Sequence, residues 1–457
     1  MKKERLKELK DKLNKKIESK SSRKTSRFSR LKKEYKNKDL KENNNLKIIG
    51  ITGSRGKSTV AYMVHEYLKL LGKKCVLYSS LGVDSPASIM KSNEAIELAV
   101  SSTESLLSIL DEVEMYEADY LVLEINESTI DLVKEVPFDV KVLTNFNPKH
   151  NDEQYSDEEY KNLKQSFFKN DNNSICVMGV GSMMSKEDFL EFMSLNNNPK
   201  VTFGSKHICE VREIDYNKIN FLLHELDSSL DGLSMEVFIN GENKHFRTNT
   251  ILCHNALNYV TAMATLYALG EFEVNKFNKC IKDMMIPGRE EVLFVNGRTI
   301  VIGLFLNPAL ENFVTYKKNH EIKNIKVLTG SVGSGFKTWK EKYKDEKFIN
   351  NRSASRKFAM EQIDKYADYV YLTENDNAKE DVLDICLELQ SYLPNTKNKI
   401  VTDRETAIRE MIKESVDGDL LFISGRGNKR VLCYAEDKCK LLKDKDIVET
   451  VLKELGW

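Results

Sequence analysis

The sequence lacks any apolar run of the roughly 18 to 20 residues that a membrane-spanning helix needs. Its N-terminus is positively charged, but the apolar stretch that would complete a signal peptide does not follow. Both absences argue against a membrane or secreted protein. We therefore expect a cytoplasmic protein without a transmembrane segment.

Cysteine is sparse and irregularly spaced. Eight cysteines are spread over 457 residues, and none of them forms a Cys-x-x-Cys pair. This spacing gives little support to a zinc ribbon, and the density is too low for a disulfide scaffold. We expect free thiols throughout.

The chain has no net charge, because 70 Lys and Arg balance 70 Asp and Glu. This balance excludes a uniformly basic nucleic-acid binder, and we do not expect a nucleic acid as partner. Residues 1–40 are the exception, with 17 Lys and Arg against 6 Asp and Glu. Within them, helical spacing of four apolar residues predicts a short amphipathic helix followed by a basic tether: Leu6, Leu9, Leu13 and Ile17. This arm, residues 1–45, is either solvated or contacts an anionic surface or a partner protein.

From residue 46 onward, β-rich runs alternate with helical patterns. Strand-like Lys47–Thr52 is followed by helix-like Lys57–Leu71, and the alternation continues beyond them. It predicts an α/β fold: a central domain over residues 46–288 around a mainly parallel sheet. Pro287 and Gly288 interrupt the pattern, and a second alternating series predicts a smaller, Rossmann-like α/β domain over residues 289–457.

The strongest local motif is GITGSRGKST, residues 50–59, placed between a predicted strand and a predicted helix. Glycine lets the backbone curl so that its N–H groups face phosphate oxygens at a helix N-terminus. Lys57 can then reach the outer phosphates and Ser58 can contact Mg²⁺. The first glycine of the common formula is replaced by Ile51, so a plain glycine-rich turn stays an alternative. The predicted ATP loop comprises Gly53, Ser54, Arg55, Gly56, Lys57, Ser58 and Thr59.

This variant loop resembles that of the Mur ligase family, which are ATP-dependent carboxylate–amine ligases. Further segments match in the family's order over residues 46–430: Tyr120–Ser128, Leu143–His150, Tyr160–Lys164, His254–Asn258 and Ile286–Glu290. Segments of the last domain are most similar to the muramoyl-tripeptide ligase branch. The resemblance implies a central P-loop domain and an ATP-dependent ligase.

The resemblance also implies ligands for two Mg²⁺ ions. Ser58 and Glu124 match the residues at the first ion, and His150 matches a histidine that assists the second. Lys164 matches a lysine that CO₂ converts to a carbamate, which would help to hold the second ion. By the same resemblance Lys57, His150 and Lys164 would be catalytic.

Five other positions are matched to nucleotide and substrate. Asn258 would contact the adenine, and Arg289 would contact the nucleotide from the entry to the last domain. The segment that reads the amino acid in the family corresponds to Asp376, Asn377 and Lys379 here, with lysine in place of the usual arginine.

Several positions depart from the family pattern. Lys149 replaces an aspartate, and Gly303–Leu306 replace a segment that carries a ribose-binding aspartate. Only 45 residues precede the first strand, too few for the UDP-binding domain of the muramoyl ligases, and the basic N-terminus resembles the poly-γ-glutamate synthase branch.

We therefore expect an ATP- and Mg²⁺-dependent amide ligase that joins a small-molecule or peptide carboxylate to an amine through an acyl phosphate. The alternatives are a poly-γ-glutamate-synthase-like ligase, a simple P-loop kinase or ATPase, and a nucleotide-binding scaffold with weakened catalysis. The departures at Lys149, Gly303 and Leu306 motivate the last of these.

Overall fold

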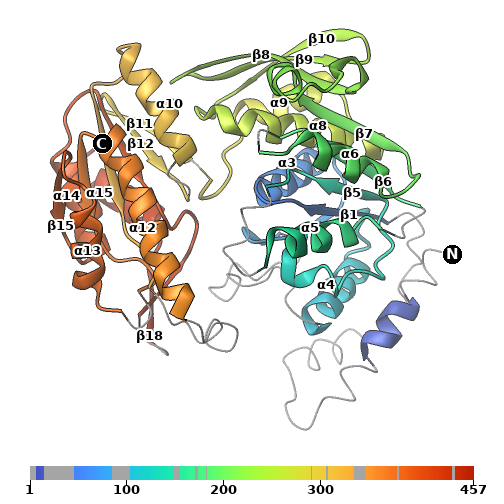
Figure 1. Ribbon diagram of the computed structural model, residues 1–457, viewed down its shortest axis with the longest axis horizontal. Coiled ribbons are helices and arrows are strands. Elements are labelled where there is room, and N and C mark those ends of the chain that lie inside the picture. The colour runs from blue at the N-terminus through green and yellow to red at the C-terminus, as the bar shows by residue number, and fades with distance from the viewer. Residues whose placement is uncertain are drawn as a thin grey trace. The chain divides into compact units, whose positions relative to one another are not determined.

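Figure 1 shows the computed structural model of the chain, which divides into two compact units. The structure describes residues 7–14, 46–84, 103–147, 155–169, 173–181, 183–289, 291–304, 307–333, 346–377, 380–434 and 438–457. Unit 1 takes the described residues of Met1–Leu226, Met235–Phe246 and Asn255–Lys282. Unit 2 takes those of Asp227–Ser234, Arg247–His254 and Asp283–Trp457.

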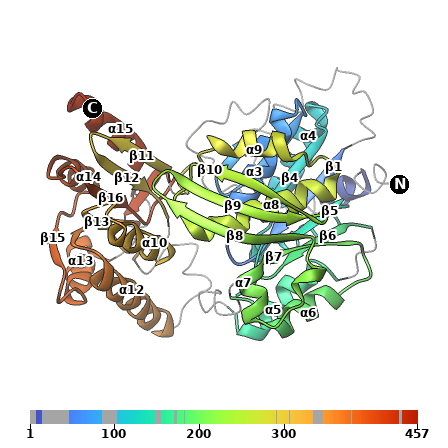
Figure 2. The same ribbon diagram turned by 90° about the horizontal axis from the view of Figure 1, so that it is seen from above.

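A ten-stranded sheet forms the centre of unit 1, in the order β10-β9-β8-β7-β6-β5-β1-β4-β2-β3. The strands from β2 across to β8 pair in parallel, as the alternating pattern predicted, and β3 is antiparallel to β2. Figure 2 shows β8, β9 and β10 side by side at the sheet edge, and this ribbon was not anticipated. The strands are β1 (Lys47–Thr52), β2 (Cys75–Ser79), β3 (Gly82–Asp84), β4 (Tyr120–Glu124), β5 (Val140–Leu143), β6 (Ile175–Gly179), β7 (Lys200–Ser205), β8 (Phe221–Ser229), β9 (Gly232–Ile239) and β10 (Glu242–Thr248).

Helices cover both faces of this sheet, as a parallel sheet requires. On one face α3 (Lys57–Leu70) packs against α8 (Ala256–Leu269) and α9 (Val274–Lys282). On the other face lie α4 (Thr103–Met115), α5 (Asp157–Ser166) and α6 (Lys186–Ser194), which share one hydrophobic cluster with the strands (Figure 1). A short helix, α7 (Lys206–Val211), follows β7.

The predicted N-terminal helix is present over residues 7–14 and packs on unit 1. Leu9 and Leu13 are buried in the cluster that contains α4, and each buried leucine contributes about 2 kcal/mol. Lys10 forms ion pairs with Asp111 at 2.8 Å and with Glu114 at 2.7 Å. This part of the arm therefore contacts the chain's own acidic helix, while the basic tether lies outside the described residues.

Unit 2 is built on a six-stranded sheet in the order β11-β12-β16-β13-β14-β15. All its pairs are parallel except β11–β12, so the predicted Rossmann-like α/β fold is confirmed. One face carries α10 (Asn307–Lys318), α12 (Glu346–Tyr366) and α13 (Val382–Ser391), and the other α14 (Arg404–Lys413) and α15 (Asp444–Glu454). The strands are β11 (Glu291–Val295), β12 (Arg298–Ile302), β13 (Asn324–Thr329), β14 (Tyr369–Leu372), β15 (Lys397–Ile400) and β16 (Asp419–Ile423).

A separate hairpin of unit 2 corrects the expectation of free thiols. β17 (Val431–Tyr434) and β18 (Lys438–Leu441) pair antiparallel, and Cys433 and Cys439 form a disulfide across them. The two cysteines are six residues apart in sequence, so the Cys-x-x-Cys pattern does not reveal the disulfide. They come together because the hairpin register sets Cys433 opposite Cys439. The other six cysteines are free.

Within the described residues, none of the helices has the combination of length and apolar composition that spanning a bilayer requires.

Candidate functional site

The phosphate loop joins the end of β1 to the start of α3, as the motif predicted. Gly53 has φ +147° and Gly56 has φ +80°. Residues that carry a side chain rarely adopt these backbone conformations. A Cβ on Gly53 would lie 2.1 Å from the Thr144 hydroxyl, and one on Gly56 would lie 2.2 Å from Asn258 Oδ1. Both glycines are therefore required by backbone conformation and by close approach.

The two residues that follow β5, Thr144 and Asn145, hold the loop by hydrogen bonds. The carbonyl oxygen of Asn145 accepts a bond from the Ser54 N–H at 3.2 Å, and its side-chain Oδ1 accepts one from the Arg55 N–H at 2.9 Å. Thr144 Oγ1 donates to the Arg55 carbonyl at 2.6 Å. Sequence reasoning had noted the segment that contains Thr144 and Asn145 but had given neither residue a role.

Lys57, the first residue of α3, folds back onto the loop. Its Nζ donates to the Gly53 carbonyl at 2.8 Å and to the Ser54 carbonyl at 3.4 Å. Phosphate oxygens carry negative charge that these neutral carbonyls lack, so a charge-assisted bond to phosphate would be the stronger one. The following residues Ser58 and Thr59 are buried in the first turn of α3.

A cluster of oxygen atoms lies beside the loop where two neighbouring strands end. Glu124, at the end of β4, accepts bonds from the Ser58 hydroxyl at 3.0 Å and from the Ser80 N–H at 2.7 Å. The hydroxyl groups of Ser58 and Ser80 lie 2.7 Å apart. A carboxylate with two hydroxyl groups is a donor set that fits Mg²⁺. Ser80 was missed from sequence, although it directly follows β2, the parallel neighbour of β4.

Lys164 lies fully buried on α5, below the same loop. Its Nζ forms an ion pair with Glu127 Oε1 at 2.5 Å and donates to Thr52 Oγ1 at 3.1 Å and to the Gly53 carbonyl at 3.2 Å. Burial, and next the positive charge of Lys57, lower the pKa of Lys164 to about 8, against the opposing effect of Glu127.

Glu127 is another residue that sequence reasoning left without a role. Burial alone would raise its pKa, but the positive charges of Lys164 and Lys57 outweigh burial and lower the pKa to about 2. Tyr160 donates to Glu127 Oε1 at 3.2 Å, and its hydroxyl also lies 3.0 Å from Ser54 Oγ. Tyr160 and Lys164 are four residues apart on α5, so the helix presents both to the loop. The signal in the sequence was an acidic residue three positions after Glu124.

Asn258 is near the loop, because its side chain faces Gly56. Its Nδ2 donates to Asn255 Oδ1 at 2.9 Å. His150, with its neighbour Lys149, lies outside the described residues, as does Lys379. Arg289 belongs to unit 2, where its N–H donates to the Ile286 carbonyl at 3.0 Å.

In unit 2, Asp376 lies in a network of opposite charge. Arg426 Nη1 donates to Asp376 Oδ1 and Lys429 Nζ to Oδ2, both at 2.9 Å. The Cys433 N–H also donates to Oδ1, at 3.1 Å. Burial would raise the pKa of Asp376, but Lys429 and Arg426 outweigh it and lower the pKa. Asn377 donates to the Glu380 carbonyl at 2.7 Å. The predicted substrate residues Asp376 and Asn377 thus have partners within unit 2.

A buried ion pair lies beside this network. Arg404 on α14 and Asp444 on α15 are both fully buried, and the guanidinium binds both carboxylate oxygens at 2.8 Å. Arg404 also donates to the Ser424 carbonyl at 2.8 Å.

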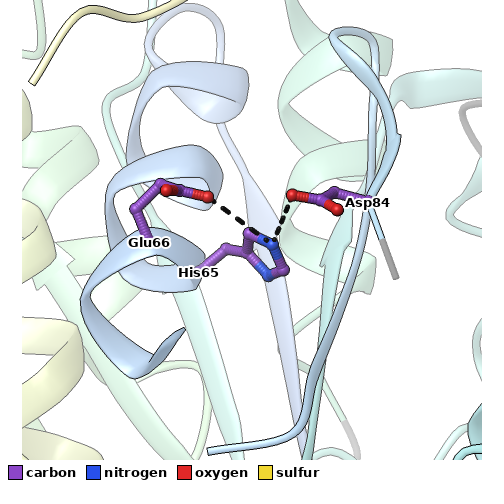
Figure 3. A group of neighbouring side chains, drawn as sticks. All are labelled: His65, Glu66 and Asp84. Atoms are coloured by element: carbon purple, nitrogen blue, oxygen red, sulfur yellow. Dashed lines mark hydrogen bonds and ion pairs between the residues drawn. The ribbon is translucent and has the colours of Figure 1, made fainter. Parts of the chain in front are cut away.

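A further group of ligand-type side chains lies away from the loop: His65 and Glu66 on α3 and Asp84 on β3 (Figure 3). His65 Nε2 is 3.1 Å from Asp84 Oδ2. Lys69 already binds Glu66 at 3.0 Å and Asp84 at 2.9 Å. The hydrogen bond from His65 and, despite burial, that from Lys69 lower the pKa of Asp84. The group therefore ties α3 to β3 through hydrogen bonds and ion pairs.

Comparison with known proteins agrees with this geometry. Residues 51–266 match the Mur ligase middle domain family. This segment of the chain is therefore similar in sequence to that domain. A relative from Alkaliphilus oremlandii, named UDP-N-acetylmuramoyl-L-alanyl-D-glutamate–2,6-diaminopimelate ligase, is 26% identical over 85% of this chain and 74% of its own.

Solved structures of Mur ligases share the fold. MurF ligase from Thermotoga maritima in complex with ADP superimposes with a TM-score of 0.59 at 16% identity, over 91% of this chain and 81% of that one. Folylpolyglutamate synthase from Mycobacterium tuberculosis superimposes with a TM-score of 0.59 at 14% identity, over 84% of this chain and 89% of that one. The family resemblance inferred from the motifs is thereby confirmed, and all three named proteins are ligases or synthases, as the expected enzyme class requires.

Proposed function

We propose that this Mur ligase domain protein is an ATP-dependent amide ligase. A substrate carboxylate attacks the γ-phosphorus of ATP, which forms an acyl phosphate and expels ADP. An amine then attacks the acyl carbon and expels phosphate. The activation step is needed because a carboxylate resists direct attack by an amine.

The arrangement around the phosphate loop is the observation that supports this proposal. Two ammonium groups, Lys57 and Lys164, both bond to the Gly53 carbonyl, so their charges converge where the loop receives phosphate. Positive charge held in place before the reaction stabilises the charge that develops on the transferred phosphoryl group. Lys57 would bind the outer phosphates.

The oxygen cluster fits a divalent cation. Ser58, Glu124 and Ser80 would hold Mg²⁺ next to the phosphates, and His150 is proposed from the family resemblance for a second ion. The ion would supply charge neutralisation in phosphoryl transfer. The chain's own residues keep Glu124 in place by the hydrogen bonds from Ser58 and Ser80. By the same resemblance Asn258 and Arg289 would contact the nucleotide.

The amine and the carboxylate are open within this class. The curated relatives carry the name of a diaminopimelate ligase, so an amino acid is the first amine to test. Asp376, Asn377 and Lys379 are proposed to bind it. The carbamate that the resemblance implies for Lys164 is considered in the next subsection.

An ADP-release screen over amino acids and carboxylate acceptors tests the proposal. We expect ADP only when both substrates are present, and Lys57→Ala should lower its formation by about 10³-fold or more. Lys73→Ala, at a half-buried site beyond the same helix, is the control and should leave the rate unchanged. Full activity of Lys57→Ala would show that the loop is not the catalytic one.

The same screen separates the alternatives. Release of phosphate without any amine would indicate a P-loop kinase or ATPase. Binding of a non-hydrolysable ATP analogue without ADP formation from any mixture would indicate a nucleotide-binding scaffold. Activity with glutamate as the amine and a glutamate peptide as the carboxylate would indicate a poly-γ-glutamate-synthase-like ligase.

A further inference from the structure

The ammonium group of Lys164 is surrounded by three hydrogen-bond acceptors. They are Glu127 Oε1 at 2.5 Å, Thr52 Oγ1 at 3.1 Å and the Gly53 carbonyl at 3.2 Å. An ammonium group has three N–H bonds and no lone pair, so three acceptors match it fully.

None of the three groups has a hydrogen that it could donate to the oxygens of a modified lysine. The Gly53 carbonyl has no hydrogen to donate, and a carboxylate such as Glu127 only accepts. The Thr52 hydroxyl donates its single hydrogen to the Ile125 carbonyl at 2.9 Å, which leaves its oxygen as an acceptor toward Lys164. The surroundings of Nζ therefore specify a donor in three directions.

A carbamate does not fit these surroundings. Carbamylation joins CO₂ to the neutral amine through a new N–C bond and releases one proton. The product keeps one N–H and adds two oxygens that share a negative charge. Two of the three acceptors would lose their donor, and the new carboxylate would lie beside Glu127 with the same charge, in a fully buried place.

Glu127 is itself held in position. Tyr160 donates to its Oε1 at 3.2 Å, and Lys164 binds the same oxygen. Tyr160 is buried and its ring lies 5.8 Å from that of Phe146 in a stacked arrangement, which fixes the hydroxyl. The Glu127 carboxylate thus already lies against Lys164 Nζ, where carbamylation would add a carboxylate.

We propose that Lys164 functions as an unmodified ammonium group and that Glu127 is a further residue of this site, providing from the chain itself the carboxylate that the family resemblance assigns to CO₂. The role of Glu127 in catalysis rests on the proposed function, whereas the chemical state of Lys164 does not.

Carbon-13 NMR of the full chain in ¹³C-labelled bicarbonate tests the state of Lys164. We expect no carbamate carbonyl resonance in the wild-type protein. A resonance that is present in the wild type and absent from Lys164→Arg would overturn the proposal. As a second measurement on the wild type alone, ADP formation should be the same in CO₂-free buffer and in bicarbonate; a loss that bicarbonate restores would also overturn it.

The role of Glu127 is tested by Glu127→Gln, with Glu158→Gln on the exposed face of α5 as the matched control. We expect ADP formation to fall about 100-fold in Glu127→Gln, as when one preorganised polar group is lost, with no recovery in bicarbonate. The affinity of the variant for the ATP analogue should stay within about threefold of the wild-type affinity. A merely structural defect would lower this affinity as well. Full activity of Glu127→Gln would refute the role, and if no substrate pair gives ADP with the wild type, the proposed function fails while the NMR result stands.

Discussion

In unit 1, Lys57 at the loop is held by neutral backbone carbonyls, whereas in unit 2 the buried Arg404 is held by a carboxylate that binds it through both oxygens. Within the part of the chain that the structure describes, the hydrogen-bond acceptors of Lys57 Nζ are the Gly53 and Ser54 carbonyls. Arg404, in contrast, binds both oxygens of Asp444, and neither residue is exposed. A positively charged side chain is therefore bound by neutral groups at the loop of unit 1 and by a full counter-charge in the interior of unit 2.

The difference lies in what fixes each site. The loop of unit 1 is fixed through its backbone, by glycine conformation and by Asn145. The cluster of unit 2 is fixed through the charged side chains themselves. Substitutions should therefore affect ligand binding in unit 1 and folding stability in unit 2.

The largest effect is expected for the buried pair. Asp444→Asn leaves the Arg404 guanidinium buried without its counter-charge, which should lower the free energy of unfolding by about 3–5 kcal/mol in urea titrations. Glu454→Gln is the matched control, because Glu454 pairs with Arg409 across the same two helices at an exposed site. It should cost less than about 1 kcal/mol. Equal losses for the two variants would remove the contrast between the units.

An intermediate effect is expected for the loop. Gly56→Ala forces a Cβ against Asn258 at positive φ, and should weaken binding of an ATP analogue about 100-fold, or about 2.7 kcal/mol, by calorimetry. Gly72 also has positive φ, but a Cβ there would meet nothing within 4 Å. Gly72→Ala should therefore cost only conformational strain, about 1 kcal/mol of stability, with unchanged nucleotide binding. Weak binding in both variants would mean that strain, and not the contact with Asn258, is decisive.

The smallest effect is expected for the hairpin disulfide of unit 2. Reduction of Cys433–Cys439 opens a very short loop, so it should lower the free energy of unfolding by about 2 kcal/mol. Urea titrations with and without a thiol reductant measure this. The double variant Cys433→Ser and Cys439→Ser should show no response to the reductant, and a response there would place the effect at another cysteine.

The sequence allowed the parts of the molecule that backbone physics dictates to be predicted. Strand β1 has the predicted bounds, Lys47–Thr52, and α3 ends one residue before its predicted end, because a buried apolar run and a glycine turn carry local signals. The parallel sheet and the second α/β unit followed from the alternation of elements. The ribbon β8–β10 was not predicted, because its strands have exposed polar faces and interrupt that alternation.

The side-chain partners in the candidate site were harder to predict, since they depend on strands that are distant in sequence. Ser80 reaches Glu124 only because β2 lies beside β4, and Glu127 reaches Lys164 only because α5 crosses below the loop. Likewise, the disulfide depends on the register that sets Cys433 opposite Cys439. Motif spacing alone contains none of this.

The helix over residues 7–14 has a practical consequence for handling the protein. Leu9 and Leu13 shield apolar side chains of α4 from water, and Lys10 forms ion pairs with Asp111 and Glu114. A shortened chain that starts at the first strand would uncover both. Expression work should therefore retain this N-terminal segment, since its removal would expose apolar surface and promote aggregation.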